Sequence, residues 1–116
     1  VVSAALAEAV PEGHVRFLRN CALHHTIGDY VFVHAGVRPG VAFDRQTPTD
    51  LLWIRDDFLR VRIPLPGRVV VHGHTPTPTR LPVIKPNRIA LDTGAVYGGK
   101  LTCAVLEADR LGFIQR

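Results

Sequence analysis

The stretch VVVHGHTP, residues 69–76, decides the fold of this chain. Three consecutive β-branched residues predict a strand that is buried on both faces, and the Gly, Thr and Pro that follow end it abruptly. His72 and His74 therefore lie where a buried strand runs out into a loop. The end of such a strand favours site chemistry, because the backbone there is rigid while the side chains reach solvent or a ligand.

A second stretch, Tyr30 to Gly36, repeats this plan with the sequence YVFVHAG. An apolar run is followed by His34 and then by small residues, so two strand ends that each carry a histidine predict one shared site. Neutral imidazole is a common ligand of first-row metals. The alternative is that each histidine is a loop residue satisfied by hydrogen bonds. Because side chains alternate along a strand, His72 and His74 point to the same side, and either one could be the ligand.

Length and composition predict one globular unit at most. The 116 residues are 47% hydrophobic, which fits a packed core and argues against disorder. The chain contains no methionine, so we expect an internal or C-terminal piece of a longer protein. Residues 1–10 are apolar, but they carry Glu8 and no preceding basic residues. This opening is a poor signal peptide and too short for a membrane span, and we interpret it as the end of a helix.

Cysteines and charge narrow the compartment and the partners. Cys21 and Cys103 lie far apart in apolar segments, which predicts buried thiols in a reducing, cytoplasmic compartment. The net charge of +4 comes mostly from scattered arginines, without a basic run or interleaved aromatic residues. We therefore expect no nucleic-acid or membrane partner, and a modest attraction for phosphate.

The remaining pattern predicts a mixed α/β (α+β) body. A helix is expected to begin near Pro11, with Val15, Leu18 and Ala22 facing the core, and the segment 24–29 is expected to be a turn. Further expectations are an irregular connection at 60–67, a proline-rich loop at 75–87, and strands at 88–91, 101–107 and 112–114, the last two paired across a turn at 108–109.

A second helix has clearer boundary signals. Thr47 is a capping residue, Pro48 takes the first helical position, and Asp50 completes a pattern like a capping box. The apolar run LLWI at 51–54 follows, and Arg55 comes directly after it. An arginine beside so large an apolar cluster either extends to water or is held inward to bind an anion.

Four motifs carry a resemblance to a known family. FVHAG (32–36), LLWIR (51–55), VVHGHTP (70–76) and IALDTGA (89–95) occur in this order and at about the spacing of the bacterial PPP-type serine/threonine phosphoprotein phosphatases, within the calcineurin-like metallophosphoesterase superfamily. The resemblance is to the C-terminal half of that domain and covers nearly the whole chain. It implies that residues 1–116 are the C-terminal portion of a single metallophosphoesterase domain, a four-layer αββα β-sandwich.

The resemblance also implies a centre of two divalent metal ions, manganese, iron or zinc, at the strand tips. Family members hydrolyse phosphomonoesters with a metal-activated water, and the substrate is a phosphorylated protein or a small phosphate compound. By similarity, His34 and His74 bind one of the metal ions, Arg55 holds the substrate phosphate, and Tyr97 in the AVYGG loop lines the site. His72 would then orient its neighbour.

Parts of the family pattern are missing from this chain. The motifs GDxHG, GDxxDRG and GNHE of the N-terminal half, which supply the other metal ligands and the proposed general acid, do not occur. We therefore expect this chain alone to bind metal poorly and to be inactive, and we assign the activity to the parent protein. The alternatives within the superfamily are a degenerate, non-catalytic phosphate-binding domain and a dinucleoside-polyphosphate hydrolase.

An enzyme of another class is the remaining alternative, because ALDTGA also resembles the active-site signature of retroviral-type aspartic proteases. In those subunits the signature lies early, and a flap and a further strand follow it, whereas only residues 95–116 follow Gly94 here. Asp92 is therefore better interpreted as structural. Its carboxylate is expected to accept backbone N–H bonds in the tight turn before Gly94.

Overall fold

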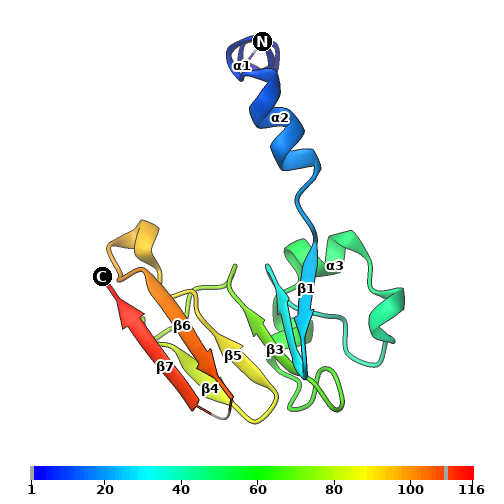
Figure 1. The fold of residues 1–116 in the computed structure, drawn as a ribbon, viewed down its shortest axis with the longest axis vertical. Coiled ribbons are helices and arrows are strands. Elements are labelled where there is room, and N and C mark those ends of the chain that lie inside the picture. The colour runs from blue at the N-terminus through cyan, green and yellow to red at the C-terminus, as the bar shows by residue number, and fades with distance from the viewer. Residues whose placement is uncertain (1, 109) are drawn as a thin grey trace.

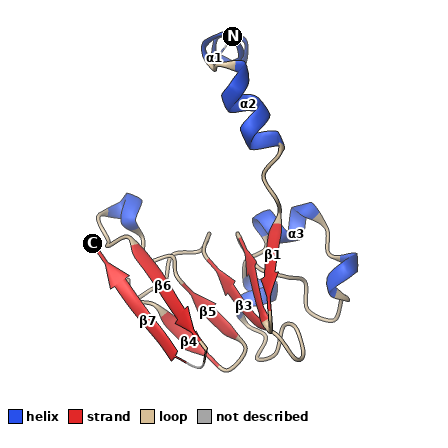
Figure 2. Cartoon of the chain, in the orientation of Figure 1, coloured by secondary structure: helices blue, strands red, loops and turns tan. Residues whose placement is uncertain are grey.

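The computed structural model describes residues 2–108 and 110–116, which form a mixed sheet, a separate hairpin and an N-terminal helical arm (Figures 1 and 2). The helices are α1 (Val2–Ala9), α2 (Glu12–Arg19), α3 (Pro48–Trp53) and α4 (Asp56–Leu59), with short 3-10 helices η1 (Phe43–Arg45) and η2 (Ala95–Tyr97). The strands are β1 (His24–Ile27), β2 (Tyr30–Val33), β3 (Val69–His72), β4 (Val83–Lys85), β5 (Arg88–Ala90), β6 (Thr102–Glu107) and β7 (Arg110–Gln115).

The main sheet has a parallel centre. Within the described residues its strand order is β1-β2-β3-β5-β4, in which β2, β3 and β5 run parallel and the two edge strands are antiparallel to their neighbours. The β6 and β7 strands pair only with each other, as an antiparallel hairpin. The predicted α/β class is confirmed. Because β2 and β3 are parallel neighbours, the residues that follow them lie at the same end of the sheet, where the carboxyl ends of these strands meet.

One face of the sheet carries the hydrophobic core. Val31 and Val70 are directly paired across β2 and β3, and both are fully buried. Leu51 of α3 and Phe58 of α4 pack in the same cluster, together with Ile54, Val33, Ala35, Val37 and Leu65. Each fully buried side chain of this size contributes roughly 1.5–3 kcal/mol relative to leaving it in water. The two short helices therefore cover one side of the strands that carry the histidines.

The start of α3 agrees with the capping pattern in the sequence. The backbone N–H of Asp50 donates to Oγ1 of Thr47 at 3.2 Å, and the Thr47 hydroxyl donates to the Asp50 carboxylate at 2.9 Å. Pro48 is the first helical residue, as predicted. The helix ends at Trp53, so Arg55 lies in the connection to α4.

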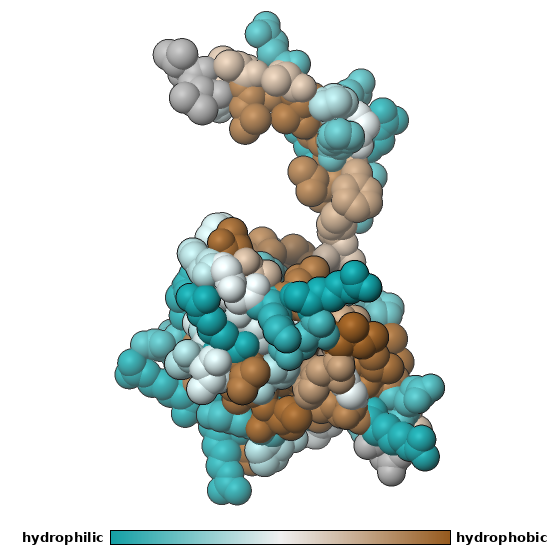
Figure 3. All heavy atoms as spheres, turned by 90° about the vertical axis from the view of Figure 1, so that its left-hand side faces the viewer, coloured by the Kyte–Doolittle hydropathy of each residue, from teal (hydrophilic) through white to brown (hydrophobic). Residues whose placement is uncertain are grey.

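The N-terminal arm is helical, as predicted, but its apolar residues do not face the core as the sequence analysis expected them to. Leu18 is 66% exposed, Ala22 is also exposed, and Val15 is half-buried. Figure 1 shows α1 and α2 projecting away from the sheets, and Figure 3 shows apolar side chains along this arm. Helical periodicity identifies the apolar face of a helix but not what covers it. Within the described residues, nothing covers this face.

Two segments expected to be irregular contain strands. His24 and His25 were predicted to lie in a turn, but they belong to β1, which pairs with β2, while the turn itself is at 28–29. The proline-rich loop was expected to lack regular structure, yet β4 forms between Pro82 and Pro86. Both are edge strands, where proline and polar side chains are tolerated because one side of the strand makes no ladder hydrogen bonds.

The two cysteines do not lie where the sequence analysis placed them. Cys21 and Cys103 are free and exposed, not buried. Cys21 follows α2 in the arm, and Cys103 lies on the exposed side of β6, whose burial alternates along the strand. Among the described residues, no helix combines the length and the apolar character that crossing a bilayer requires.

A glycine beside the core offers a test of this packing. A Cβ added to Gly36 would lie 2.6 Å from Cγ of Phe58, a ring that is fully buried. We predict that Gly36→Ala lowers the free energy of unfolding by about 1–3 kcal/mol, because the ring has no space to move into. Chemical denaturation measures this change. The matched control is Gly13→Ala in α2, where a Cβ meets no atom within 4 Å. That variant should not lower stability, and an equal loss in both variants would contradict the packing.

Candidate metal centre

Two histidines meet at the end of the sheet where β2 and β3 stop. Nε2 of His34 lies 3.1 Å from Nδ1 of His74, and the ring centroids are 4.9 Å apart. His34 comes directly after β2, and His74 comes two residues after β3. The backbone N–H of Gly73 donates to the His34 carbonyl at 2.9 Å, which extends the parallel pairing to this point. The structure thus brings His74, and not His72, to His34.

The spacing of these two nitrogens fits a shared cation as well as a hydrogen bond. Nitrogen ligands about 2.0–2.1 Å from a zinc ion are about 3 Å apart when they meet the metal at roughly a right angle. The nitrogens that face each other, at 3.1 Å, match this separation. In the described part of the chain, no cluster of three or more His, Cys, Asp or Glu side chains surrounds a cation position. The pair therefore supplies at most two ligands.

His74 is held in an unusual backbone conformation. Its φ angle is +65°, in the left-handed region that costs a non-glycine residue roughly 1–2 kcal/mol. The ring packs edge-on against Trp53, with centroids 5.7 Å apart. Burial lowers the pKa of His74, and the positive charge of Arg55 and the neighbouring His34 lower it further. The ring therefore stays neutral, which is the form that binds metal.

His72 occupies a different environment, two residues away. It is 3% exposed and packs edge-on against Phe58 at a centroid distance of 4.8 Å. Its Nδ1 lies 3.2 Å from the Gly73 carbonyl, which assigns the proton to Nδ1 and leaves Nε2 buried without a partner. The two rings contact different aromatic side chains, His72 that of Phe58 and His74 that of Trp53. Because β3 ends at His72 and His74 has a left-handed backbone, strand alternation does not describe how the two side chains are related.

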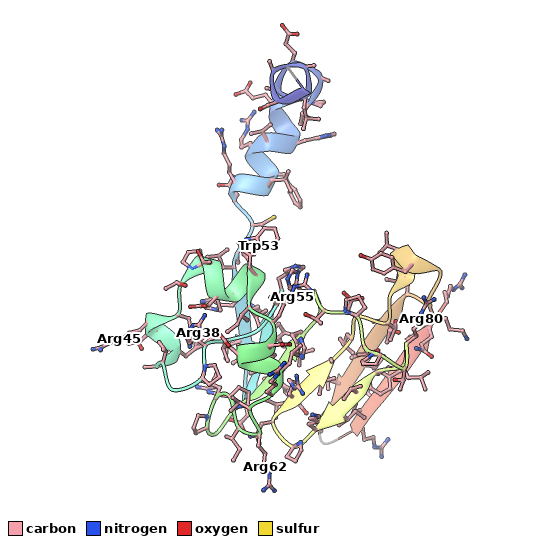
Figure 4. All side chains as sticks on the ribbon, turned by 180° about the vertical axis from the view of Figure 1, so that it is seen from behind. Arg38, Arg45, Trp53, Arg55, Arg62 and Arg80 are labelled. Carbon is pink, nitrogen blue, oxygen red and sulfur yellow. The ribbon has the colours of Figure 1, made fainter. Side chains whose placement is uncertain are left out.

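Arg55 lies close enough to the histidine pair for its charge to act on His74. It connects α3 to α4, is exposed, and is close enough to lower the pKa of His74. Figure 4 shows it on the same part of the molecule as Trp53. The two side chains help to line a hollow of about 300 Å³. The described residues offer the Arg55 guanidinium neither a hydrogen bond nor an ion pair. Its role as a phosphate ligand stays a prediction.

Tyr97 is not placed beside the histidines. It ends the 3-10 helix η2 and is 68% exposed, and its carbonyl accepts a hydrogen bond from Nη1 of Arg80 at 3.0 Å. Ala95 and Val96, but not Tyr97, line the open cavity of about 720 Å³ that His34 also lines. The proposed contact of Tyr97 with a substrate finds no support in this geometry.

Asp92 has the structural role expected from the sequence. Its Oδ1 accepts a hydrogen bond from the backbone N–H of Gly94 at 3.0 Å. Gly94 has a φ angle of +73°, a conformation that glycine adopts without steric cost. The carboxylate therefore stabilises the turn after β5.

The sequence analysis did not assign Trp53 to the site. Its indole is 67% exposed although it belongs to the apolar run LLWI, and it packs on His74. The signal that could have identified it is its place in the six-residue helix α3, two residues before Arg55. An aromatic side chain that is exposed beside charged groups provides an apolar wall for a site.

Comparison with known proteins supports the fold. No family model and no curated protein matches the chain. A solved structure described as "a putative diadenosine tetraphosphatase" is similar over 97% of this chain, with a TM-score of 0.73 and 24% sequence identity. The chain spans 59% of the length of that structure. The likeness confirms the expected α/β fold.

The buried histidine predicts a pH dependence of stability. Burial lowers the pKa of His72 from 6.5 to about 4. Between these two values the unfolded chain binds a proton that the folded chain does not, so stability falls as the pH falls. The full loss is up to about 3 kcal/mol, and above pH 6.5 this contribution is constant.

Denaturation at about pH 7 and about pH 4.5, in a chelating buffer, measures this loss. We expect His72→Phe to reduce the difference in unfolding free energy between the two pH values, whatever its effect on absolute stability. His14→Gln, at an exposed position of α2, is the control and should leave the difference unchanged. An equal pH dependence in the wild-type chain and His72→Phe would show that His72 does not titrate as proposed.

Proposed function

We propose that this chain is the C-terminal portion of a metal-dependent phosphoester hydrolase. His34 and His74 would hold one of two divalent metal ions, and Arg55 would bind the substrate phosphate. The observation that carries the proposal is the approach of Nε2 of His34 to Nδ1 of His74 at 3.1 Å, at the ends of two adjacent parallel strands. The positive charge of Arg55 acts on the same histidine.

The residues of the site have complementary roles in this proposal. A bound pair of divalent ions would lower the pKa of water and neutralise charge on the phosphate oxygens. His34 presents its Nε2 toward His74, and the lowered pKa of His74 reduces competition by protons for the metal. Arg55 offers a planar fork of N–H donors to the phosphate. The indole of Trp53 shields one side of His74 from water.

The substrate that we propose first is a phosphorylated serine or threonine side chain of a protein, as the four motifs imply. A dinucleoside polyphosphate is the second candidate, and the description of the structural neighbour favours it. Both substrates present phosphate oxygens to the same cations and to Arg55. They differ in the bond that breaks, a phosphate ester in one and a phosphoanhydride in the other. Release of inorganic phosphate from a phosphopeptide, compared with release of nucleotides from diadenosine tetraphosphate, distinguishes them.

The coding sequence upstream of Val1 is the first test. We expect it to encode GDxHG, GDxxDRG and GNHE, which would supply the remaining metal ligands and the general acid. If these motifs are absent from an intact upstream sequence, the hydrolase proposal fails and a non-catalytic phosphate-binding domain takes its place.

Substitutions in the full-length protein test the individual roles. We predict that His34→Ala and His74→Ala each reduce bound metal and lower turnover of an aryl phosphate roughly 100-fold or more, because loss of residues that only support a ligand already costs 10- to 100-fold. Arg55→Ala should weaken turnover and phosphate binding while metal content stays unchanged. Metal analysis and steady-state kinetics measure these effects.

The control for these variants is His14→Ala, an exposed histidine of the arm. It should retain both metal and activity. Loss of metal in Arg55→Ala would contradict a role in phosphate binding, and unchanged metal content in both histidine variants would contradict the metal centre.

A further inference from the structure

One arginine ties the loop that follows His34 to both short helices. Nε and Nη2 of Arg38 donate to Oδ1 of Asp50 at 2.9 and 2.6 Å, and Nη1 donates to Oδ2 of Asp57 at 2.9 Å (Figure 4). Asp50 belongs to α3, and Asp57 belongs to α4. Arg55 lies in the connection between these helices. We call Arg38, Asp50 and Asp57 the arginine clamp.

The clamp is itself held in place. The side chain of Gln46 accepts from the Arg38 backbone N–H at 2.7 Å and donates to the Arg38 carbonyl at 3.0 Å. The backbone N–H of Ala35 donates to the Leu51 carbonyl at 2.9 Å, which joins the start of the same loop to α3. The hydrogen bonds from Arg38 hold the pKa of Asp50 below its usual range. The Arg38 side chain therefore joins the loop, α3 and α4 in addition to the hydrogen bond from Ala35 to Leu51 and the core that they share.

The clamp is better suited to fixing the positions of α3 and α4 than to stabilising the whole fold. The Asp50 side chain is 13% exposed, but Arg38 is 42% and Asp57 is 68% exposed. Exposed ion pairs contribute little to stability, typically below about 1 kcal/mol. A fork of donors nevertheless fixes geometry, because both carboxylates must lie in directions set by one planar guanidinium. The ion pair between Arg38 and Asp57 therefore does more to fix the position of α4 than to stabilise the fold.

We propose that Arg38 is a positioning residue for Arg55: by joining α3 to α4, the arginine clamp sets where the Arg55 guanidinium meets a phosphate. This inference rests on the proposed role of Arg55 in phosphate binding. Arg38 lies four residues after His34, so the same loop that delivers a metal ligand also orients the phosphate ligand. The two halves of the site would then keep a constant distance from each other.

The same helix contains a second ion pair that provides a matched control. Nη2 of Arg60 donates to Oδ2 of Asp56 at 2.6 Å, at spacing i,i+4, and both side chains are exposed. This pair lies on α4 and its end and does not reach α3. Arg60→Lys matches Arg38→Lys, because both keep the positive charge and remove a guanidinium fork, but Arg60→Lys leaves the clamp intact.

The test measures the dissociation constant of inorganic phosphate for the metal-loaded full-length protein. Arg38→Lys keeps the charge but removes the fork, so long-range attraction for phosphate is preserved while the geometry is lost. We expect phosphate binding to weaken about threefold or more, a typical coupling between residues of one network, with unchanged metal content. Arg60→Lys should leave phosphate binding unchanged. Asp57→Asn, at an exposed position, repeats the test with little risk to folding.

A double-mutant cycle separates positioning from a structural role. In the Arg55→Ala background, Arg38→Lys and Asp57→Asn should have no further effect on phosphate binding, because the group that they position is gone. If each variant weakens binding by the same factor in both backgrounds, or has no effect in either, the clamp does not act through Arg55. If Arg55→Ala alone leaves the dissociation constant unchanged, the proposed function fails instead.

Discussion

The parallel pairing of β2 with β3 is the constraint on which the rest of the site depends. Val31 lies opposite Val70 and Phe32 opposite Val71, and the hydrogen bond from Gly73 to the His34 carbonyl continues this register past the strand ends. A shift of one residue would move every side chain of β3 to the other face of the sheet. It would take Val70 out of the cluster around Phe58 and His74 away from His34. The energy that buries the valines therefore also sets the distance between the imidazoles.

Two histidines separated by one glycine have different environments in this arrangement, one in the core and one at the candidate site. His72 is still part of the strand, so it packs on Phe58 in the core and is kept neutral by burial. His74 lies past the strand, and its left-handed backbone turns the ring toward His34 and Trp53. The turn does not depend on the small size of Gly73, because its φ angle lies outside the left-handed region and an added Cβ would meet its nearest atoms at 3.8 Å; the left-handed residue is His74. One buried strand thus supplies a core residue and a site residue in succession.

Much of this arrangement could be predicted from the sequence, because it depends on local patterns. The strands that end near His34 and His74 follow from runs of apolar residues, and the start of α3 follows from Thr47 and Pro48. The choice between His72 and His74 could not be made, since period-2 alternation says nothing about where a strand gives way to a left-handed residue. That choice was decided by the backbone of a single position.

The remaining differences have non-local causes. Whether Leu18 in the arm and Cys103 on the hairpin are buried depends on whether another element covers them, and no local pattern encodes this. Val83 to Lys85 becomes a strand because β5 offers it a free edge, despite the flanking prolines. The contacts of the Arg38 side chain are also non-local. Its partners are 12 and 19 residues away in sequence, and only the fold shows that one guanidinium reaches both.

The close approach of His34 and His74 is also informative about how the pair behaves toward protons. Two neutral imidazoles whose Nε2 and Nδ1 atoms lie 3.1 Å apart can share one N–H between these nitrogens, but a second proton there would make one ring an imidazolium and bring two N–H groups face to face. Burial and the charge of Arg55 already disfavour the protonated form of His74. A divalent cation between the rings would need no proton there, because both nitrogen lone pairs would be free to bind it. Under the proposed function, the positive charge of Arg55 would oppose a cation at His74 as it opposes a proton, and an anionic phosphate bound to Arg55 would remove that opposition. Metal and phosphate would therefore each favour the binding of the other.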